Sequence, residues 1–465
     1  MENKMFCFQC EQTAGCSGCT GKAGVCGKSA LTAKLQDQLT GALITLAKKN
    51  EINEVNTKAI IEGLFTTITN VSFNDETLKQ LIDKVHSLSG NTSDYDMSNL
   101  WNENEDIRSL KSLILFGIRG MAAYAYHAMV CNYTDNDVNE FFYTSLSAIG
   151  SDLSQEELLP LVLKTGEINL KCMALLDKAN TETFGNPEPT KVTLEIEKGP
   201  FIVITGHDLY DLKQLLEQTK DKGINIYTHG EMIPSHGYPG LKKYPHLVGN
   251  FGSAWQNQQK EFDNIPGCIL MTTNCLMRPR ETYKDRIFTT SVVGWDGVKH
   301  IPKGKDGKKD FTEIINKALE LGGYEEDQEP HEILVGFGHN ATLSNAETIV
   351  NAVKDGKIRH FFLIGGCDGA RPGRSYYTEF AKMVPDDCII LTLACGKYRF
   401  NKLEFGEVAG LPRLLDVGQC NDAYSAVRIA TALADAFGTD VNGLPLSLII
   451  SWYEQKAVAD LLALL

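Results

Sequence analysis

The sequence lacks the features that direct a protein through or into a membrane. No basic segment followed by an apolar stretch opens the chain of 465 residues, so we find no secretory signal. The most apolar long stretch, residues 110–130, carries Lys111, Arg119 and His127, which favours a buried helix over a membrane span. We therefore expect a cytoplasmic protein with no membrane partner. Its 13 cysteines should stay reduced there and bind metal more often than they form disulfides.

Positive charge is also scarce. The 45 Lys and Arg residues stand against 59 Asp and Glu, and the net charge of -14 argues against a nucleic-acid partner. The phosphate-binding fingerprint of dinucleotide-binding folds is missing, because Gly336-Phe-Gly-His339 has no third glycine. We therefore expect no bound nicotinamide cofactor. Length and a hydrophobic content of 43% indicate a globular protein of two to four domains.

What the sequence has instead is a dense group of thiols near its start. The glycine-rich run of residues 5–28 has almost no apolar side chains to pack, so something other than a core must order it. Thiolates this close together surround an iron–sulfur cluster or a zinc ion, or form disulfides. The tight Cys-x-x-Cys loops favour a cluster, whose irons each need one thiolate, whereas zinc would use only four of the five thiols. The five are Cys7, Cys10, Cys16, Cys19 and Cys26.

The next part of the chain, to about residue 195, shows the 3.6-residue spacing of helices. A polar break at 89–103 divides six helical segments into two groups of three, so we predict two three-helix bundles in a first domain, 1–196. Asp75 and Ser154 are the expected N-caps. The segments are 31–49, 55–71, 75–88, 104–133, 137–149 and 154–179. We predict no chemistry in these helices and assign four candidate ligands to core or surface: His86, His127, Cys131 and Cys172.

Beyond residue 185 short apolar runs alternate with helical stretches, which is typical of a parallel α/β sheet. A glycine-, lysine- and acid-rich stretch near residue 330 divides this part. We predict two Rossmann-like α/β domains, 197–330 and 331–465. The expected strands are 201–205, 224–228, 268–273, 287–293, 333–337, 360–364, 388–393, 414–417 and 446–450.

Side chains that bind metals follow many of these strands. Ligands of open α/β sheets lie beyond the carboxyl ends of the strands. These residues therefore occupy equivalent loop positions, each just after a strand. Taken singly, each is better explained as a buried cysteine or a capping acid, and Cys268 and Cys388, which begin their strands, belong to the core. Taken together they suit a mixed site, with sulfur ligands for an iron–sulfur portion and harder ligands for iron bound to oxygen. The residues are His207, His229, Glu231, Cys275, Cys367, Cys395, Cys420 and Glu454.

Eight motifs carry a resemblance that covers nearly the whole chain. The sequence resembles the hybrid-cluster (prismane) protein family of hydroxylamine reductases, which implies a helical N-terminal domain, two Rossmann-like domains and a kinship with carbon monoxide dehydrogenase. The motifs are Cys7-Phe-Gln-Cys-Glu-Gln-Thr-Ala14, Gly206-His-Asp-Leu209, Tyr227-Thr-His-Gly-Glu-Met232, Thr272-Thr-Asn-Cys275, Gly365-Gly-Cys-Asp-Gly369, Lys397-Tyr-Arg-Phe400, Leu415-Asp-Val-Gly-Gln-Cys-Asn-Asp422 and Ser451-Trp-Tyr-Glu-Gln-Lys456.

The resemblance also implies two cofactors. The N-terminal thiols Cys7, Cys10, Cys19 and Cys26 would hold a [4Fe-4S] cluster, or a [2Fe-2S] cluster as in some members. A hybrid [4Fe-2O-2S] cluster would be bound beside Lys456, with Cys367 carrying a persulfide. Its ligands would be His207, Glu231, Cys275, Cys367, Cys395, Cys420 and Glu454. Three features depart from the family pattern: the extra Cys16, a Cys19–Cys26 interval longer by one residue, and a last domain shortened at its C-terminus.

The implied reaction is the reduction of hydroxylamine to ammonia and water by two electrons and two protons. An external electron-donor protein would feed the N-terminal cluster; the basic loop 303–309 either docks it or is simply solvated. Glu454, Lys456, His229 and His339 are the candidate proton carriers. Lys456 reaches the site only if the turn after Glu454 is not helical. The alternatives are nitric oxide reduction in nitrosative-stress defence and transfer of nitrosyl groups to other proteins' thiols.

Overall fold

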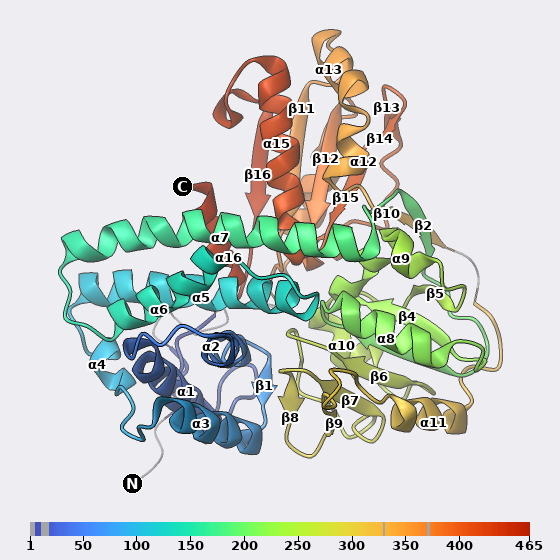
Figure 1. Cartoon of the computed structure of the whole chain (residues 1–465). Coiled ribbons are helices and arrows are strands. Elements are labelled where there is room, and N and C mark those ends of the chain that lie inside the picture. The colour runs from blue at the N-terminus through green and yellow to red at the C-terminus, as the bar shows by residue number, and fades with distance from the viewer. Residues whose placement is uncertain (1–4, 11–17, 329–330, 370–372) are drawn as a thin grey trace.

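Helices form the first part of the chain, and the rest is built around two larger sheets, in a computed structural model that describes residues 5–10, 18–328, 331–369 and 373–465. In Figure 1 the helices lie to the left of the first sheet and below the second. The predicted class, a helical part followed by α/β structure, is confirmed.

Seven helices make up the described first part. All six predicted segments are present, although the second ends early, at Thr66, and a short extra helix, α4, forms in the polar break. The helices are α1 (Ala30–Lys48), α2 (Glu54–Thr66), α3 (Asp75–Ser89), α4 (Met97–Trp101), α5 (Glu105–Val130), α6 (Asn136–Ile149) and α7 (Gln155–Phe184).

The two predicted N-caps had different outcomes. Ser154 caps α7 in a capping box, because its hydroxyl accepts the N–H of Glu157 and the Glu157 carboxylate accepts the N–H of Ser154. The prediction for Asp75 was wrong. Asn74 caps α3 by accepting the N–H of Thr77, and Asp75 is the first residue of the helix, where a carboxylate still favours the helix dipole.

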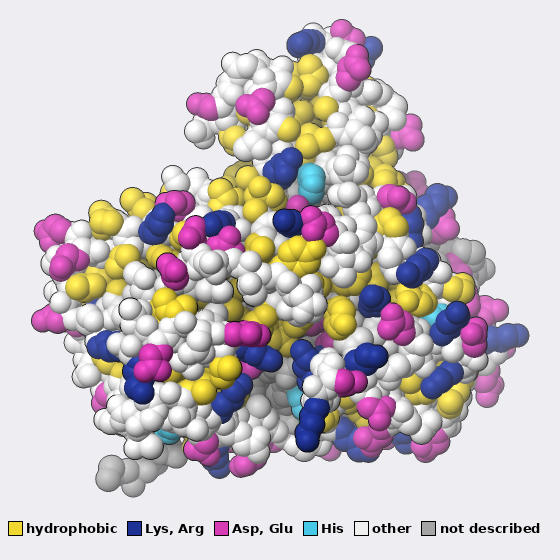
Figure 2. Space-filling model, viewed as in Figure 1, with side chains coloured by type: hydrophobic (Ala, Val, Ile, Leu, Met, Phe, Trp, Pro, Cys, Tyr) yellow, Lys and Arg dark blue, Asp and Glu magenta, His cyan; other side chains and the backbone are white. Residues whose placement is uncertain are grey.

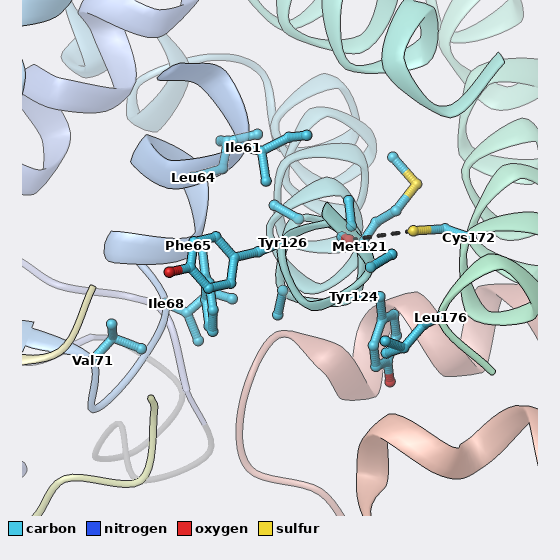
Figure 3. Close-up of a cluster of buried hydrophobic side chains, with 14 of the residues drawn as sticks. Ile61, Leu64, Phe65, Ile68, Val71, Met121, Tyr124, Tyr126, Cys172 and Leu176 are labelled. Atoms are coloured by element: carbon cyan, nitrogen blue, oxygen red, sulfur yellow. Dashed lines mark hydrogen bonds between the residues drawn. The ribbon is translucent and has the colours of Figure 1, made fainter. Parts of the chain in front are cut away.

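Helix α5 is the centre of the helical part. It is long and apolar enough to cross a membrane, but 78% of its most apolar window is buried inside the protein, as in the core helix of a globular domain. Figure 3 shows Phe65 and Tyr126 packed on one side of it and Cys172 on the other, where the Cys172 thiol donates to the Met121 carbonyl. Cys172 therefore lies in the core, as we expected.

The first sheet has eight strands within the described residues, in the order β10-β2-β5-β4-β3-β6-β7-β9. Neighbours are parallel except β10 and β2. Helices α8 (Leu209–Thr219) and α11 (Thr312–Leu321) lie beside this sheet (Figure 1). The strands are β2 (Thr190–Thr193), β3 (Phe201–Thr205), β4 (Asn225–His229), β5 (Leu247–Asn250), β6 (Cys268–Met271), β7 (Ile287–Thr290), β9 (Lys299–Ile301) and β10 (Glu332–Val335).

Strand β10 is not where the sequence placed it. We expected this run to open the second α/β sheet, but it pairs antiparallel with β2 at the edge of the first, with Ile333 opposite Val192. Edge pairing between distant segments depends on the assembled fold, and an apolar run carries no information about its partner.

The second sheet is smaller and fully parallel, in the order β15-β12-β11-β16. Its strands are β11 (His360–Gly365), β12 (Cys388–Leu393), β15 (Leu414–Gly418) and β16 (Leu446–Ile450), and its helices are α12 (His339–Leu343), α13 (Ala346–Lys354), α14 (Tyr376–Met383) and α15 (Ala423–Phe437). The arrowheads of these strands point toward the junction with the helical part and the first sheet (Figure 1). Loops after both sheets therefore meet in the middle of the molecule.

After β16 the chain leaves the second sheet and returns to the helices. Helix α16 (Lys456–Leu464) packs against α5 and α7. Two glycines permit the close approach: a Cβ at Gly166 would overlap the Leu462 carbonyl, and one at Gly120 would lie 2.7 Å from the Gln455 carbonyl oxygen. The first residue of α16, Lys456, is thereby carried into the centre of the molecule.

Candidate metal centre

Three of the predicted ligands meet at one point. The metal-binding atoms of His207, Glu231 and Cys420 all lie within 4.8 Å of one another, and all three side chains are buried. His207 Nε2 is 3.1 Å from the Cys420 sulfur and 3.9 Å from Glu231 Oε2. The Cys420 N–H donates to Glu231 Oε2 at 2.7 Å. The loops after β3, β4 and β15 therefore supply an imidazole, a carboxylate and a thiol to one centre.

The orientation of His207 follows from the residues around it. Gly206 turns the chain with φ of 106°, a conformation that a side chain would not allow beside Thr272 and Thr273. The Thr273 hydroxyl lies 2.9 Å from the His207 N–H and 3.1 Å from ring Nδ1, which leaves Nε2 facing Cys420. Burial and the nearby Lys456 charge lower the pKa of His207 well below its usual value, so the imidazole is neutral, as a metal ligand must be.

Three more predicted thiols form a second group beside the first. Cys275, Cys367 and Cys395 pack in one buried cluster with Trp255 and Tyr453. The backbone is held in a left-handed conformation at Cys275, with φ of 77°, and at the residue before Cys395. Such strained conformations persist where the surrounding structure enforces them, often at functional sites.

The acid that follows β16 completes the set together with a lysine. Glu454 lies before α16, so the turn is not helical, as a role for Lys456 requires. The fully buried Lys456 ammonium donates to the Cys420 sulfur at 2.9 Å and lies 3.5 Å from His207 Nε2. Burial alone would lower the pKa of Lys456, but the charges of Cys420 and Glu454 outweigh it and raise that pKa, so the side chain stays protonated.

The donors around this centre fit a metal cluster. Burial raises the pKa of the four thiols, and the neighbouring carboxylates raise it further. Thiolates therefore form here only with a compensating metal charge. Glu231 Oε1 and Glu454 Oε1 are buried with no hydrogen-bond partner among the described residues, and only Glu454 Oε1 has the Lys456 ammonium nearby, at 4.0 Å, so a bound cation would offset the cost of burying these oxygens. Sulfur and oxygen donors on one centre match a mixed iron–sulfur–oxygen group.

Two predicted proton carriers have partners elsewhere. His229 uses its ring nitrogens toward the Thr205 hydroxyl at 3.0 Å and Glu261 Oε2 at 3.1 Å. His339 lies beside Ser425 and Asp177. Neither imidazole lies among the seven predicted ligands. The role of His229 and His339 in proton transfer stays a prediction.

The N-terminal thiols are the second predicted site. Cys7, Cys10, Cys19 and Cys26 are all partly buried, and Cys16 lies outside the described residues. Two backbone hydrogen bonds join Cys7 and Cys19, at 3.2 and 2.7 Å. Burial raises the pKa of Cys7, the Lys28 charge 3.8 Å away lowers it, and the charge of Cys26 raises it again. Cys7 therefore lies beside Cys19 and near Cys26, and a cluster shared by all four thiols stays a prediction.

An aromatic pair lies between the two sites. The rings of Trp255 and Tyr453 stack with centroids 4.2 Å apart, and Cys10 borders the buried cluster that contains both rings and the ligands Cys275 and Cys367. Gln455 fastens this region to the N-terminal loop, because its amide donates to the backbone carbonyl and the side chain of Gln9, both at 3.1 Å. A cavity of about 260 Å³ beside them is bordered by Cys10, Tyr453 and Glu454.

The sequence analysis missed the contribution of the helices to this centre. Tyr124 of α5 donates from its hydroxyl to Asp460 of α16, and Figure 3 shows its ring directed away from Phe65 and Tyr126, toward the C-terminal part of the chain. Asp460 itself was detectable, since it is the one acid in the apolar stretch 457–465 and lies one helical turn after Lys456.

The basic loop at 303–309 also differs from the expectation. Lys309 is buried and bonds Asp211 at 2.6 Å, so it anchors the loop and does not belong to an exposed basic patch. Lys303, Lys305 and Lys308 remain exposed. On the face shown in Figure 2, acidic and basic side chains are interspersed.

Comparisons with known proteins identify the family of the chain. The family model described as "Prismane/CO dehydrogenase family" matches residues 5–465. A protein named hydroxylamine reductase from Thermodesulfovibrio yellowstonii is 52% identical over 502 residues, which cover 99% of this chain and 92% of that protein. Another of that name from Methanocella arvoryzae is 49% identical over 510 residues, covering 99% and 92%.

Solved structures share the fold. The carbon monoxide dehydrogenase from Thermococcus sp. AM4 superposes with a TM-score of 0.58 at 17% identity, over 99% of this chain and 82% of that one. Carbon monoxide dehydrogenase IV from Carboxydothermus hydrogenoformans gives 0.58 at 15% identity, over 96% and 81%. With a family model that spans the chain and relatives about half identical to it, the protein belongs to the Prismane/CO dehydrogenase family.

Proposed function

We propose that this protein is a hydroxylamine reductase, an oxidoreductase that converts hydroxylamine to ammonia and water. The observation that carries the proposal is the buried centre where the predicted ligands from both sheets meet a charged lysine. The curated relatives that match the whole chain bear this name.

Two iron–sulfur groups would serve the reaction. Cys7, Cys10, Cys19 and Cys26 would hold a [4Fe-4S] cluster, and the seven ligands named above a hybrid [4Fe-2O-2S] cluster. The hybrid cluster would supply electrons and a Lewis-acidic iron to the substrate nitrogen or oxygen. The Trp255–Tyr453 pair and Cys10 belong to one packed cluster with Cys275, Cys367 and Cys395, and electrons from an external donor protein would cross there.

The protein's own groups handle protons and charge. Cleavage of the N–O bond takes two electrons and two protons, and the Lys456 ammonium is positioned among the ligands as an acid. Glu454 holds the Lys456 backbone N–H at 3.0 Å with one oxygen, which fixes the start of α16. Burial of the candidate ligands and of Lys456 limits their contact with bulk water and strengthens these interactions.

Lys456→Met tests the assignment of the acid. Turnover of hydroxylamine should fall by about 100-fold or more, the usual contribution of a positioned general acid. Iron content should stay at the wild-type level, because the lysine is not a ligand. Lys111→Met is the matched control: Lys111 is also a buried lysine, but at the far end of α5, where its ammonium donates to the Ser151 carbonyl. Wild-type turnover of Lys456→Met would contradict the role of Lys456.

Cys16→Ala tests the choice of N-terminal ligands. A four-iron cluster has no iron for a fifth thiolate, so the variant should keep its full iron content and its N-terminal cluster spectrum. Loss of the N-terminal iron in this variant would show that Cys16 replaces one of the four proposed ligands.

A further inference from the structure

A short segment after β12 contacts the loops that carry three other proposed ligands. This segment, residues 397–399, ends the 3-10 helix η4 (Cys395–Arg399), which starts at the proposed ligand Cys395. Each of its three side chains bonds a different loop. The segment belongs to the motif 397–400 noted in the sequence, which has no part in the proposed reaction. We call residues 397–399 the clamp segment.

Lys397 holds the loop of Cys420. Its fully buried ammonium forms an ion pair with Asp416 of β15 and donates to the Gly418 carbonyl at 2.9 Å. The same Asp416 oxygen accepts the Gly418 N–H at 3.1 Å. Gly418, with φ of 146°, therefore has both of its backbone groups fixed two residues before Cys420.

Tyr398 joins the second sheet to the first. Its hydroxyl donates to the Gly230 carbonyl at 2.8 Å and lies 3.3 Å from the Asn250 side-chain oxygen. Gly230 directly precedes Glu231, whose carboxylate accepts the Cys420 N–H. The phenol therefore connects the loop after β12 with the loop that carries the proposed carboxylate ligand of the other sheet.

Arg399 holds the loop of Cys367 through two contacts. Its Nε donates to Asp368 Oδ2 at 2.7 Å and its Nη2 to the Gly369 carbonyl at 2.9 Å. The other oxygen of Asp368 pairs with Arg374 at 2.5 Å. Asp368 directly follows Cys367 and has a left-handed backbone, with φ of 50°, which the surrounding structure must enforce. A guanidinium suits this task, because its planar donors fix two acceptors at once.

We propose, resting on the proposed function, that the clamp segment positions the ligands of the hybrid cluster. It fixes the loops of Cys367, Glu231 and Cys420 relative to Cys395, so the donors are held near their bound places before the metal enters. Lys397, Tyr398 and Arg399 are positioning residues, because they act through the ligand loops. Such outer partners orient the donors of a metal and tune its electronic state.

Tyr398→Phe tests the hold on the loop of Glu231. The ring stays packed and only the hydroxyl is lost, so the protein should fold and keep its full iron content. The Gly230 N–H donates to the Ser253 carbonyl at 3.0 Å, and its hydrogen exchange in the loaded protein should be about fivefold faster once the loop is released. Exchange at Asp368 should stay at the wild-type rate, while the paramagnetic signal of the hybrid cluster should shift.

Arg399→Met tests the hold on the loop of Cys367. The Asp368 N–H donates to the Ser451 carbonyl at 2.9 Å, and its exchange should be about fivefold faster, with Gly230 unchanged. The hybrid-cluster signal should shift and turnover should fall by about tenfold or more. Arg399→Lys should restore part of the signal and of the turnover, because it keeps the charge but not the two fixed donors.

Two matched controls change similar side chains away from the proposed ligands. Tyr143 is buried in the helical part and bonds the Thr57 hydroxyl at 3.1 Å. Arg413 is buried at the opposite edge of the second sheet, where it pairs with Asp386 at 2.7 Å and donates to the Cys388 carbonyl at 3.1 Å. Tyr143→Phe and Arg413→Met should lower the melting temperature and leave the hybrid-cluster signal unchanged.

The place of each effect separates positioning from a general loss of stability. Wild-type spectra and wild-type exchange in both Tyr398→Phe and Arg399→Met would overturn the proposal. So would a change of the hybrid-cluster signal in Arg413→Met as large as that in Arg399→Met. Spectra and exchange need no substrate, whereas failure of the proposed function would appear as absence of hydroxylamine turnover in the wild type.

Discussion

Cys275→Ala is expected to abolish hydroxylamine reduction and to remove the paramagnetic signal of the hybrid cluster while leaving the N-terminal signal intact. Cys275 follows β6 in a left-handed backbone conformation that aims its sulfur into the buried group with Cys367 and Cys395. Without this thiolate the proposed cluster would lose one of its ligands, and the buried Glu231 and Glu454 oxygens that have no hydrogen-bond partner among the described residues would lose the metal charge that offsets their burial. Iron and sulfide analysis with electron paramagnetic resonance measures both effects.

Cys268→Ala is the matched control. Cys268 begins the same strand at the opposite edge of the sheet, is fully buried, and has a pKa that burial raises to about 12. Cys268→Ala should lower the free energy of unfolding slightly through lost packing, and it should leave both clusters in place. Cys10→Ala should lose the N-terminal signal and slow electron entry, with the hybrid signal retained. If Cys275→Ala and Cys10→Ala lose the same signal, the division into two sites is wrong.

Gly166→Ala is expected to lower the free energy of unfolding by about 3 kcal/mol and turnover by at least about tenfold. The added methyl would overlap the backbone carbonyl of Leu462, and a backbone atom moves only if α16 moves. Alanine gains about 1 kcal/mol over glycine in helix propensity, which the overlap outweighs. Because Lys456 begins the displaced helix, its 2.9 Å contact with Cys420 should be lost. Thermal unfolding and steady-state turnover measure the two effects.

Gly63→Ala provides the comparison on α2. Its added methyl would meet only the end of the Leu43 side chain, at 2.8 Å, which rotates away more easily than a backbone carbonyl moves. Its stability should change by about 1 kcal/mol or less, and turnover should stay at the wild-type level. Equal stability and turnover of Gly166→Ala and the wild type would show that α16 is not seated as tightly as we describe.

The sequence brought three of the candidate ligands together because a local rule places them. Residues that follow parallel strands meet at one edge of a sheet. His207, Glu231 and Cys420 could therefore be grouped because each follows an apolar run that predicts a strand. Short strands such as β3 and β12 had the predicted bounds because they are continuous apolar runs between polar turns.

What the sequence did not reveal depends on long-range packing. Tyr124 looked like one more apolar position of a core helix, and only the return of α16 gives its hydroxyl a partner 336 residues away. The pairing of β10 with β2 is likewise a choice among sheet edges that no local pattern encodes. At α3, Asn74 and Asp75 are both good caps by residue type, and the backbone selected the first.

The contact of Gln455 with Gln9 sets an order of events during synthesis. The two residues are 446 positions apart, so at 5–20 residues per second the ribosome needs roughly 20 to 90 s to make the second after the first. For most of that interval Cys7 and Cys10 have left the ribosome, while the segment that contacts the loop around them does not yet exist. The first thiols are therefore open to iron–sulfur delivery, or to oxidation, before the segment around Gln455 has been made and can contact the N-terminal loop.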